Sequence, residues 1–191
     1  MSSPKSYFLK NMMCRCCIRY LREKLEDAGV RVIEVGLGQL TIDASVPDSE
    51  DKVTEITGEL GFEIIHKRDL ILVEQIKIAV IELIHHLNNT NSIIRKSDYL
   101  VEKLGMSYQH LSKTFSQHEP ITLEKYIILQ KVEKIKELID SDEYTMSEIS
   151  YIMDYSSVQH LSAQFKQITG LTPSDYRKSD RSMRTSLDEL Y

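Results

Sequence analysis

The stretch SVQHLSAQFKQ, from Ser157 to Gln167, closely repeats the stretch SYQHLSKTFSQ, which begins fifty positions earlier at Ser107. Each copy follows a short helical segment and a tight turn, at Leu104–Ser107 in the first copy and Met153–Ser157 in the second. A helix, a brief turn and a second helix predict a helix-turn-helix unit, whose second helix enters the DNA major groove. The repeat therefore predicts two recognition helices in one chain.

The spacing within each copy separates an inner face from an outer face. Leu161, Phe165 and Ile168 are four and three residues apart, so they are expected to face the core of a helical domain. The outward residues include types that bond base edges or phosphates, such as Gln to adenine and Lys to guanine or phosphate. The spacing alone fits an ordinary surface helix equally well. The predicted DNA-binding residues are Ser107, Gln109, His110, Lys113, Ser157, Gln159, His160, Ser162, Ala163 and Lys166.

The charge balance of the chain does not by itself indicate a nucleic-acid partner. Its 191 residues contain 24 Lys and Arg against 29 Asp and Glu, a formal net charge of -5. Between Lys96 and Arg181 there are eleven basic and thirteen acidic residues, a net charge of -2. Because nonspecific DNA affinity comes mostly from phosphate neutralisation, weak binding to random DNA is expected. The exception would be a basic face that gathers Lys113, Lys166, Arg177 and Lys178.

Several classes of protein are disfavoured by the sequence. The longest apolar run, Leu70 to Leu87, is interrupted by charged and polar residues and predicts no membrane span. The N-terminal sequence MSSPKSYFLKNMMCRCC lacks the apolar core of a secretion signal, so a cytoplasmic protein is expected. No Ser-His-Asp set or carboxylate pair stands out, which predicts that the protein is not an enzyme.

The first third of the chain alternates strand patterns with helical patterns. The predicted order is β-α-β-β-α-β, the ferredoxin-like plan. Gly36-Leu37-Gly38 is expected to form a hairpin turn, and Asp48 or Ser49 is expected to cap the second helix. The predicted segments are Tyr7–Lys10, Cys17–Ala28, Val30–Val35, Leu40–Asp43, a helix between Pro47 and Gly61, and Phe62–Ile65.

From Asp69 onward every segment has the helical period. The predicted fold class is therefore α+β, with a ferredoxin-like module at residues 1–68 and an all-α double helix-turn-helix domain at residues 69–180. A polar tail is expected at residues 181–191, and a break at residues 88–92. The predicted helices are Leu70–Leu87, Ser97–Leu104, Tyr108–Gln117, Leu123–Ile139, Ser147–Met153, Val158–Ile168 and Pro173–Arg177.

All three cysteines, Cys14, Cys16 and Cys17, lie just ahead of the first predicted helix. Cys14 and Cys17 form a C-x-x-C pair, and Cys16 adds a thiol within it. A helix N-terminus favours the thiolate, which is the metal-binding form, and soft thiolates suit Cu(I), other soft ions or Zn(II). The same residues also fit buried structural cysteines, a redox pair or an adventitious metal site.

The segment from Met146 to Arg177 strongly resembles the C-terminal signature of AraC/XylS-type transcriptional regulators. The most specific matches are Phe165-Lys166, Gly170-Leu171-Thr172-Pro173 and Tyr176-Arg177. The segment from Leu100 to Phe115, followed by Thr122 to Tyr126, resembles the first helix-turn-helix unit and the linker helix of that family. In total, the resemblance covers roughly Leu72 to Lys178.

This resemblance implies double-stranded DNA as the partner. It also implies two helices that enter successive segments of the major groove, about 34 Å apart. The family usually has glycine in the second turn, where this chain has Asp154. Aspartate tolerates the left-handed backbone better than most residues, so this turn is expected to survive.

The segment from Lys10 to Ile18 resembles the M-x-C-x-x-C motif of the heavy-metal-associated domain of copper chaperones and metal-pumping ATPases. The resemblance covers about Ser6 to His66 and implies a metal site at Cys14 and Cys17, with Cys16 beside them.

Together these patterns predict a sequence-specific transcription regulator that responds to a soft metal ion, as a monomer or a homodimer. Two alternatives stay open at this point. One is a metal-trafficking or metal-buffering protein whose helical domain contacts other proteins. The other keeps DNA binding but makes the N-terminal module a docking or dimerisation platform with inert thiols.

Overall fold

The computed structural model describes residues 3–86 and 96–179, so the predicted break at residues 88–92 and the predicted tail lie outside the described residues. The chain divides into two compact units, residues 1–78 and 79–191. A four-stranded sheet belongs to the first unit and helices make up the second, which is the α+β class that was predicted. Within the described residues, no helix is both long enough and apolar enough to cross a membrane.

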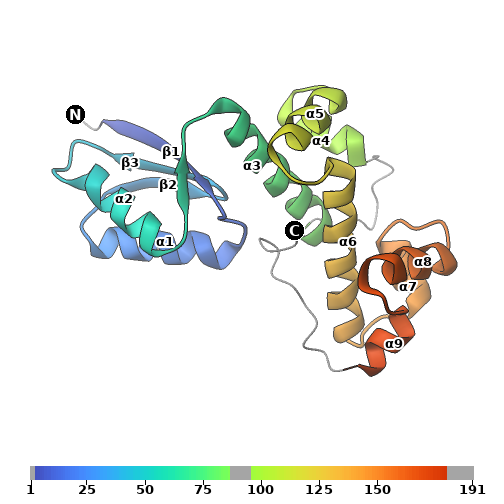
Figure 1. Ribbon diagram of the computed structural model, residues 1–191. Coiled ribbons are helices and arrows are strands. Elements are labelled where there is room, and N and C mark those ends of the chain that lie inside the picture. Colours follow the sequence, from blue (N-terminus) through green and yellow to red (C-terminus); the bar gives the residue numbers. More distant parts are fainter. Residues whose placement is uncertain (1–2, 87–95, 180–191) are drawn as a thin grey trace. The chain divides into compact units, whose positions relative to one another are not determined.

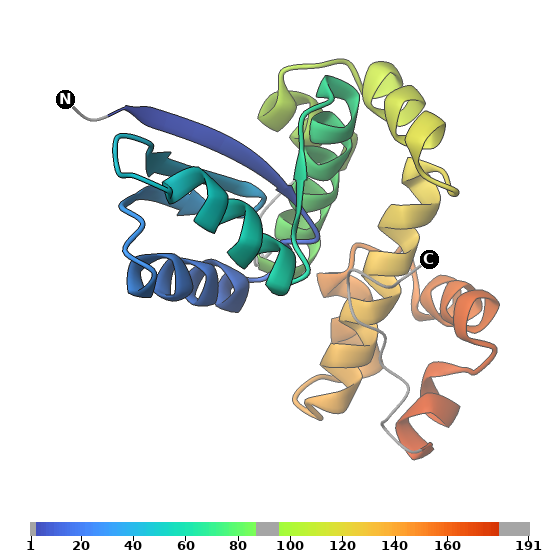
Figure 2. The ribbon, with the colours of Figure 1, turned by 60° about the vertical axis from the view of Figure 1, so that its left-hand side comes forward.

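The first unit contains one antiparallel sheet with strand order β2-β3-β1-β4. Tyr7 pairs with Leu40 across β1 and β3, and Phe8 pairs with Ile65 across β1 and β4. Figures 1 and 2 show α1 and α2 on the same face of this sheet. The elements are β1 (Pro4–Lys10), α1 (Arg15–Asp27), β2 (Val32–Gly36), β3 (Gln39–Asp43), α2 (Ser49–Glu59), β4 (Glu63–Ile65) and α3 (Arg68–Ile81), which continues into the second unit.

The core of this unit lies between the sheet and its two helices. Alternate residues of neighbouring strands, Leu9, Leu40 and Ile42, are fully buried on one face. Leu25 of α1 and Val53 of α2, also fully buried, complete the cluster from the helical side. The apolar residues at every second strand position and those at helical spacing in α1 and α2 thus pack together in one layer.

Two local predictions in this unit need correction. Helix α1 begins at Arg15 rather than at Cys17, so Cys14 occupies the N-cap and the other two cysteines lie in the first turn. Asp48 occupies the N-cap of α2 but makes no capping hydrogen bond with its side chain. Its backbone is left-handed (φ 59°), whereas a capping side chain usually needs an extended N-cap residue.

Asp43, at the end of β3, holds the N-terminal segment in place. Its carboxylate accepts hydrogen bonds from the Ser45 hydroxyl (2.7 Å) and from the backbone N–H groups of Ser3 (2.9 Å) and Ser45 (3.1 Å). These bonds, with a smaller contribution from Arg31 at 3.6 Å, lower the pKa of Asp43 to about 2. The carboxylate therefore stays charged under all but strongly acidic conditions.

Replacing Asp43 with asparagine should change how the stability of the first unit depends on pH. The pKa of Asp43 is lower in the folded protein than the value of about 3.9 expected for an unfolded chain. Its contribution is therefore present above about pH 4 and is lost as the pH falls towards 2. We expect Asp43→Asn to lower the unfolding free energy at pH 7 and to flatten its acid dependence. Urea unfolding followed through the NMR signals of β1 to β4 at several pH values measures both for the first unit alone. Asp51→Asn, on the exposed side of α2, should change neither.

The second unit is organised around the long helix α6. Figures 1 and 2 show α4 and α5 at its N-terminal end, and α7, α8 and α9 beside its C-terminal half. The π-helical turn η1 packs against α6 through His85, whose Nε2 lies 3.0 Å from Oε1 of Gln130. The elements are η1 (Glu82–His86), α4 (Lys96–Leu104), α5 (Tyr108–His118), α6 (Leu123–Asp140), α7 (Met146–Ile152), α8 (Val158–Thr169) and α9 (Pro173–Lys178).

Each helix from α5 to α9 begins at a hydroxyl side chain. In every case the hydroxyl oxygen accepts a hydrogen bond from the backbone N–H three residues later, which satisfies one of the unpaired donors of the first turn. At α7 the Glu148 carboxylate also accepts from the backbone N–H of Thr145, completing a capping box. The five caps are Ser107, Thr122, Thr145, Ser157 and Thr172.

The turns before α5 and α8 both contain a left-handed residue. Gly105 has φ 66° after α4, and Asp154 has φ 55° after α7. The expectation that Asp154 can replace the usual glycine in this turn is confirmed. The second turn is one residue longer, because three positions separate Asp154 from the Ser157 cap and two separate Gly105 from the Ser107 cap.

Candidate nucleic-acid interface

The repeated segments form α5 and α8 and begin in the same way. Ser107 accepts a hydrogen bond from the backbone N–H of His110 (3.3 Å), and Ser157 accepts one from that of His160 (3.1 Å). Both serines, predicted as phosphate contacts, are therefore first of all helix caps. Each hydroxyl keeps its own hydrogen and can still donate it to a phosphate.

The structure separates the two faces of α5 and α8 largely as predicted. Leu111 and Phe115 of α5 are fully buried, as are Leu161 and Phe165 of α8, whereas Ile168 is half-buried. Of the predicted outward residues, only Ser162 is half-buried. The exposed ones are Gln109, His110 and Lys113 on α5, and Gln159, His160, Ala163 and Lys166 on α8.

A phenylalanine–tyrosine contact anchors each of these helices. The rings of Phe115 and Tyr126 have centroids 5.3 Å apart, and those of Phe165 and Tyr176 are 5.6 Å apart. All four residues are fully buried. The tyrosines are themselves fifty positions apart, so the structural repeat extends well beyond the repeated phrase. This extension was not predicted, although the matched offset of Tyr126 and Tyr176 is visible in the sequence.

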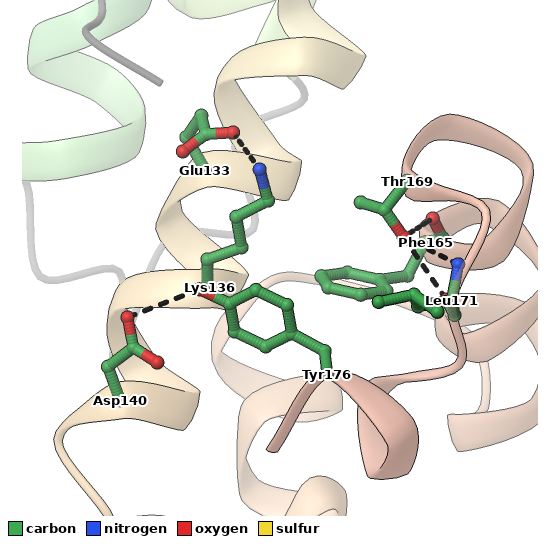
Figure 3. A network of polar contacts seen from close by, with 7 residues as sticks. All are labelled: Glu133, Lys136, Asp140, Phe165, Thr169, Leu171 and Tyr176. Carbon is green, nitrogen blue, oxygen red and sulfur yellow. Dashed lines mark hydrogen bonds and ion pairs between the residues drawn. The ribbon is translucent and has the colours of Figure 1, made fainter. Parts of the chain in front are cut away.

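Helix α9 is joined to α6 and α8 through Tyr176. Figure 3 shows the Tyr176 ring between Phe165 and α6, with its hydroxyl donating to Oδ2 of Asp140 (3.3 Å). On the same part of α6, the buried Lys136 ammonium lies 2.5 Å from Oε1 of Glu133. Helix α9 is therefore held to α6 by a hydrogen bond and to α8 by a ring contact.

Tyr155, in the turn before α8, orients the beginning of that helix. Its hydroxyl donates to Oε1 of Gln164 (2.5 Å), and the Lys131 ammonium of α6 lies 4.1 Å from the centre of its ring. Burial raises the pKa of Tyr155 to about 12, so the phenol stays protonated and can donate this bond. The contact of Tyr155 with Lys131 was not predicted, because no local pattern connects residues 24 positions apart.

Tyr155 also positions His160, a predicted DNA-binding residue. The two rings meet edge to face with centroids 5.4 Å apart. The Nδ1 atom of His160 lies 3.1 Å from the Ser156 hydroxyl. This contact occupies Nδ1, so Nε2 is the ring nitrogen that can approach a base.

Helix α5 is tied to α6 by a different residue. The Glu124 carboxylate in the first turn of α6 accepts hydrogen bonds from Tyr108 (3.0 Å) and Ser112 (3.2 Å) of α5. Burial and this carboxylate raise the pKa of Tyr108 to about 12, which keeps its hydroxyl a donor. Tyr108 corresponds to Val158 in α8, so the two copies use different side chains to fix similar helices.

Helices α5 and α8 have equivalent caps, buried anchors and exposed residues. Comparison with known proteins gives a related result. Residues 100–179 match the helix-turn-helix domain family. Relatives of this part of the chain are named as regulators of an operon or of transcription. Both α5 and α8 lie within the matched residues.

Three relatives illustrate the extent of this similarity. The xylose operon regulatory protein of Escherichia coli K12 is 31% identical over 99 residues, which are 52% of this chain and 25% of that protein. The F1 operon positive regulatory protein of Yersinia pestis is 30% identical over 89 residues, 47% of this chain and 30% of that protein. The Msm operon regulatory protein of Streptococcus mutans is 28% identical over 87 residues, which are 46% of this chain and 31% of that protein. The chain thus spans about a quarter to a third of the length of these relatives.

The basic residues that were predicted to gather on one face have different surroundings. Lys113 and Lys166 are exposed on α5 and α8. Lys131 and Lys136 are buried against partners within the unit. Arg177 is directed to the loop after α6, where Nε lies 3.8 Å from Asp142 and Nη2 donates to the Tyr144 carbonyl. Lys178 of α9 is also exposed, and both it and Lys166 help to lower the pKa of Asp175, so an acidic side chain accompanies these two lysines.

The three cysteines form a separate cluster in the first unit. Cys14 caps α1, and its Sγ accepts a hydrogen bond from the backbone N–H of Cys17 (3.2 Å). The Sγ atoms of Cys14 and Cys17 are at disulfide distance, with their Cα atoms 5.3 Å apart. Cys16 is exposed, and its Sγ lies 2.8 Å from that of Cys14. The predicted set thus comes together in space, and the pair must be reduced before it can bind a metal.

Proposed function

We propose that the chain is a cytoplasmic, sequence-specific DNA-binding regulator of transcription of the AraC/XylS type. The observation that carries this proposal is the structural equivalence of α5 and α8. Both helices begin at a serine cap, expose a Gln-His pair in the first turn and bury a phenylalanine against a tyrosine. Relatives that are named as operon regulators support the same function.

In this proposal the first turns of α5 and α8 contact bases. Gln109 and Gln159 have the side chain that bonds adenine in bidentate fashion, and the Ala163 methyl suits the methyl group of thymine. The N-terminal part of a recognition helix usually reaches the base edges, and both glutamines lie there. Because the Gln-His pair is shared, the two half-sites are expected to have similar sequences at the bases it contacts.

One chain supplies two recognition helices, so a monomer suffices for an operator with two half-sites. We take the half-sites to lie about one helical turn apart, roughly 34 Å. A homodimer would double the number of half-sites. Footprint length therefore separates the two states, because a dimer protects two copies of the paired site.

The proposal of DNA binding is tested by selecting binding sites from a random DNA pool and footprinting the protein on the selected sequences. We expect Lys166→Ala to weaken binding to the selected and the random DNA alike, since an exposed lysine on α8 is suited to a phosphate contact. Loss of one such contact should reduce the slope of log affinity against log salt by about 0.9.

The matched control is Lys24→Ala, which removes an exposed lysine from α1 of the first unit and should leave the slope unchanged. If selection enriches no sequence, the proposal of sequence-specific binding is wrong. If Lys166→Ala leaves the affinity and the slope at their wild-type values, the assignment of Lys166 is wrong.

For the first unit we propose the ferredoxin-like plan and a response to a soft metal ion, with domain bounds at residues 1–68 and 69–180. The order β1-α1-β2-β3-α2-β4 and the strand order β2-β3-β1-β4 support the plan. The thiol cluster at the N-terminus of α1 supports the metal site, with Cys14 and Cys17 as ligands and Cys16 beside them. Cu(I) or Zn(II) suits thiolates, and Met12 belongs to the hydrophobic core rather than to this donor set.

The same cluster favours a second candidate, a metal-trafficking or metal-buffering protein. A Cu(I) titration of the reduced protein and of the variant Cys14→Ser/Cys17→Ser separates the two. Tight, cysteine-dependent binding without any effect on DNA binding would favour buffering. Binding that changes the affinity for the selected DNA would favour a metal-responsive regulator.

A further inference from the structure

Cys16 gives the thiol cluster a third sulfur that a C-x-x-C pair lacks. The Sγ atoms of Cys14, Cys16 and Cys17 all lie within 4.8 Å of one another. Resting on the proposed metal response of this unit, we propose that the three cysteines form a three-thiolate site for a trivalent thiophilic ion of the arsenite class.

The three sulfurs are close enough to converge on one ion, but they must move apart to do so. For metal–sulfur bonds of about 2.3 Å, a planar three-coordinate site needs sulfurs about 4 Å apart, and a pyramidal site needs them somewhat closer. The sulfurs of Cys14 and Cys17 are at disulfide distance and those of Cys14 and Cys16 lie 2.8 Å apart, so the pair must be reduced and the three side chains must separate. Short side chains on one cap and one helical turn can reach the remaining geometry by rotating about χ1.

The number of donors selects among soft ions. Structural Zn(II) is almost always bound by four protein ligands, and no carboxylate or imidazole joins the three thiols anywhere in residues 3–86 and 96–179. Three thiolates around Cu(I) would leave a net charge of -2, and around Zn(II) a charge of -1. Around a trivalent ion the site is neutral without any contribution from the neighbouring arginines.

Binding exchanges oxygen for sulfur without a change of oxidation state. One As(OH)3 reacts with three thiols, forming three As–S bonds and breaking three As–O and three S–H bonds. The three thiol protons leave with the hydroxides as three water molecules. If Cys14 and Cys17 are oxidised, a dithiol or phosphine reductant must first supply two electrons to their disulfide.

The surroundings favour this exchange. Cys14 caps α1, where its sulfur accepts the Cys17 N–H, and the positive end of the helix dipole stabilises thiolates. The neighbouring Arg15 and Arg19, both exposed, add positive charge. Cys16 itself is exposed, so a small solute can reach the cluster from solvent.

The test compares two arsenicals that need different numbers of thiols. The full chain is reduced with a phosphine, freed of reductant under nitrogen and titrated with arsenite or with phenylarsine oxide, which has one aryl group and takes two thiols. Ultraviolet absorption of the As–S bonds gives the affinity, and native mass spectrometry gives the number of water molecules lost. We expect wild type to bind one arsenite with the loss of three water molecules.

Cys16→Ser should weaken arsenite binding by more than about tenfold. Loss of a residue that only hydrogen-bonds a metal ligand already lowers metal affinity by about tenfold or more, and Cys16 is proposed as a ligand itself. Phenylarsine oxide should bind this variant as it binds wild type, which shows that the variant is folded and that the Cys14–Cys17 pair is intact.

Three outcomes would overturn the proposal. Unchanged arsenite binding by Cys16→Ser would leave a two-thiolate site, and the proposed metal response would survive. Equal losses for both arsenicals would show that Cys16 supports the pair rather than completing the site. If neither arsenical binds wild type, the thiols are inert and the metal response fails too, whereas the DNA-binding proposal is judged separately by its footprint.

Discussion

Replacing Phe165 with alanine should destabilise the second half of the helix-turn-helix domain by about 3–5 kcal/mol and abolish binding to the selected DNA. Phe165 is fully buried on α8, and its ring meets Tyr176 edge to face at 5.6 Å. Truncation leaves a cavity beneath the recognition helix and removes the contact that connects α8 with α9. Since Tyr176 also donates a hydrogen bond to Asp140, the substitution should weaken the packing of α9 on α6 as well.

Hydrogen exchange is the suitable measurement, because the two compact units can unfold separately and a single unfolding curve would mix them. Amides of α7, α8 and α9 should exchange about 100-fold faster or more, while those of β1 to β4 keep their rates. Phe165→Leu retains most of the apolar volume and should cost less than about 1.5 kcal/mol. Should Phe165→Ala leave exchange in α8 unchanged, the anchoring role assigned to this ring is wrong.

Replacing both Gln109 and Gln159 with alanine should remove most sequence discrimination and leave the fold intact. Both glutamines are exposed in the first turns of α5 and α8, so their truncation leaves no cavity. Each bidentate contact to adenine contributes about 1–3 kcal/mol of discrimination. We therefore expect the double variant to bind the selected DNA about 30-fold more weakly or worse, with little change for random DNA.

The chain supplies a matched control for this experiment. Gln117 and Gln167 are also exposed glutamines on α5 and α8, but each lies eight residues beyond its counterpart, towards the C-terminal end of the helix. The double variant Gln117→Ala/Gln167→Ala should bind both DNAs as wild type does. Each single variant, Gln109→Ala or Gln159→Ala, should weaken protection of one half-site only. Equal effects of the test pair and the control pair would contradict base contact by the first turns.

The local structure of the second unit was largely predictable, because it depends on contacts between residues a few positions apart. Leucine and phenylalanine at helical spacing predicted the buried faces of α5 and α8, and the structure confirms them. The left-handed turn at Asp154 was also predictable, since aspartate tolerates that backbone. The prediction of a cap by Asp48 was wrong, because the sequence does not fix the backbone angle at the N-cap.

The identity of the site residues was predictable only in part. The outward glutamine, histidine and lysine residues follow from the helical period alone, and their exposure is confirmed while their contact with DNA stays a prediction. The residues that hold α8 in place were not predictable. Lys131 and Tyr155 belong to different helices or turns, and their contact depends on how α7 and α8 pack on α6.

The sequence by itself determined which segments are helices and strands, which face of each is buried, and that one helical unit is written twice. Hydrogen bonds and side-chain contacts within a few residues are sufficient for these features. Only the tertiary structure decided the strand order β2-β3-β1-β4 and the joining of α9 to α6 through Tyr176 and Asp140. Both features join residues far apart in the chain, where pairing depends on the path of the whole backbone. The approach of Cys16 to Cys14 is a local contact, but it depends on the start of α1 at Arg15, which the hydrophobic pattern does not specify.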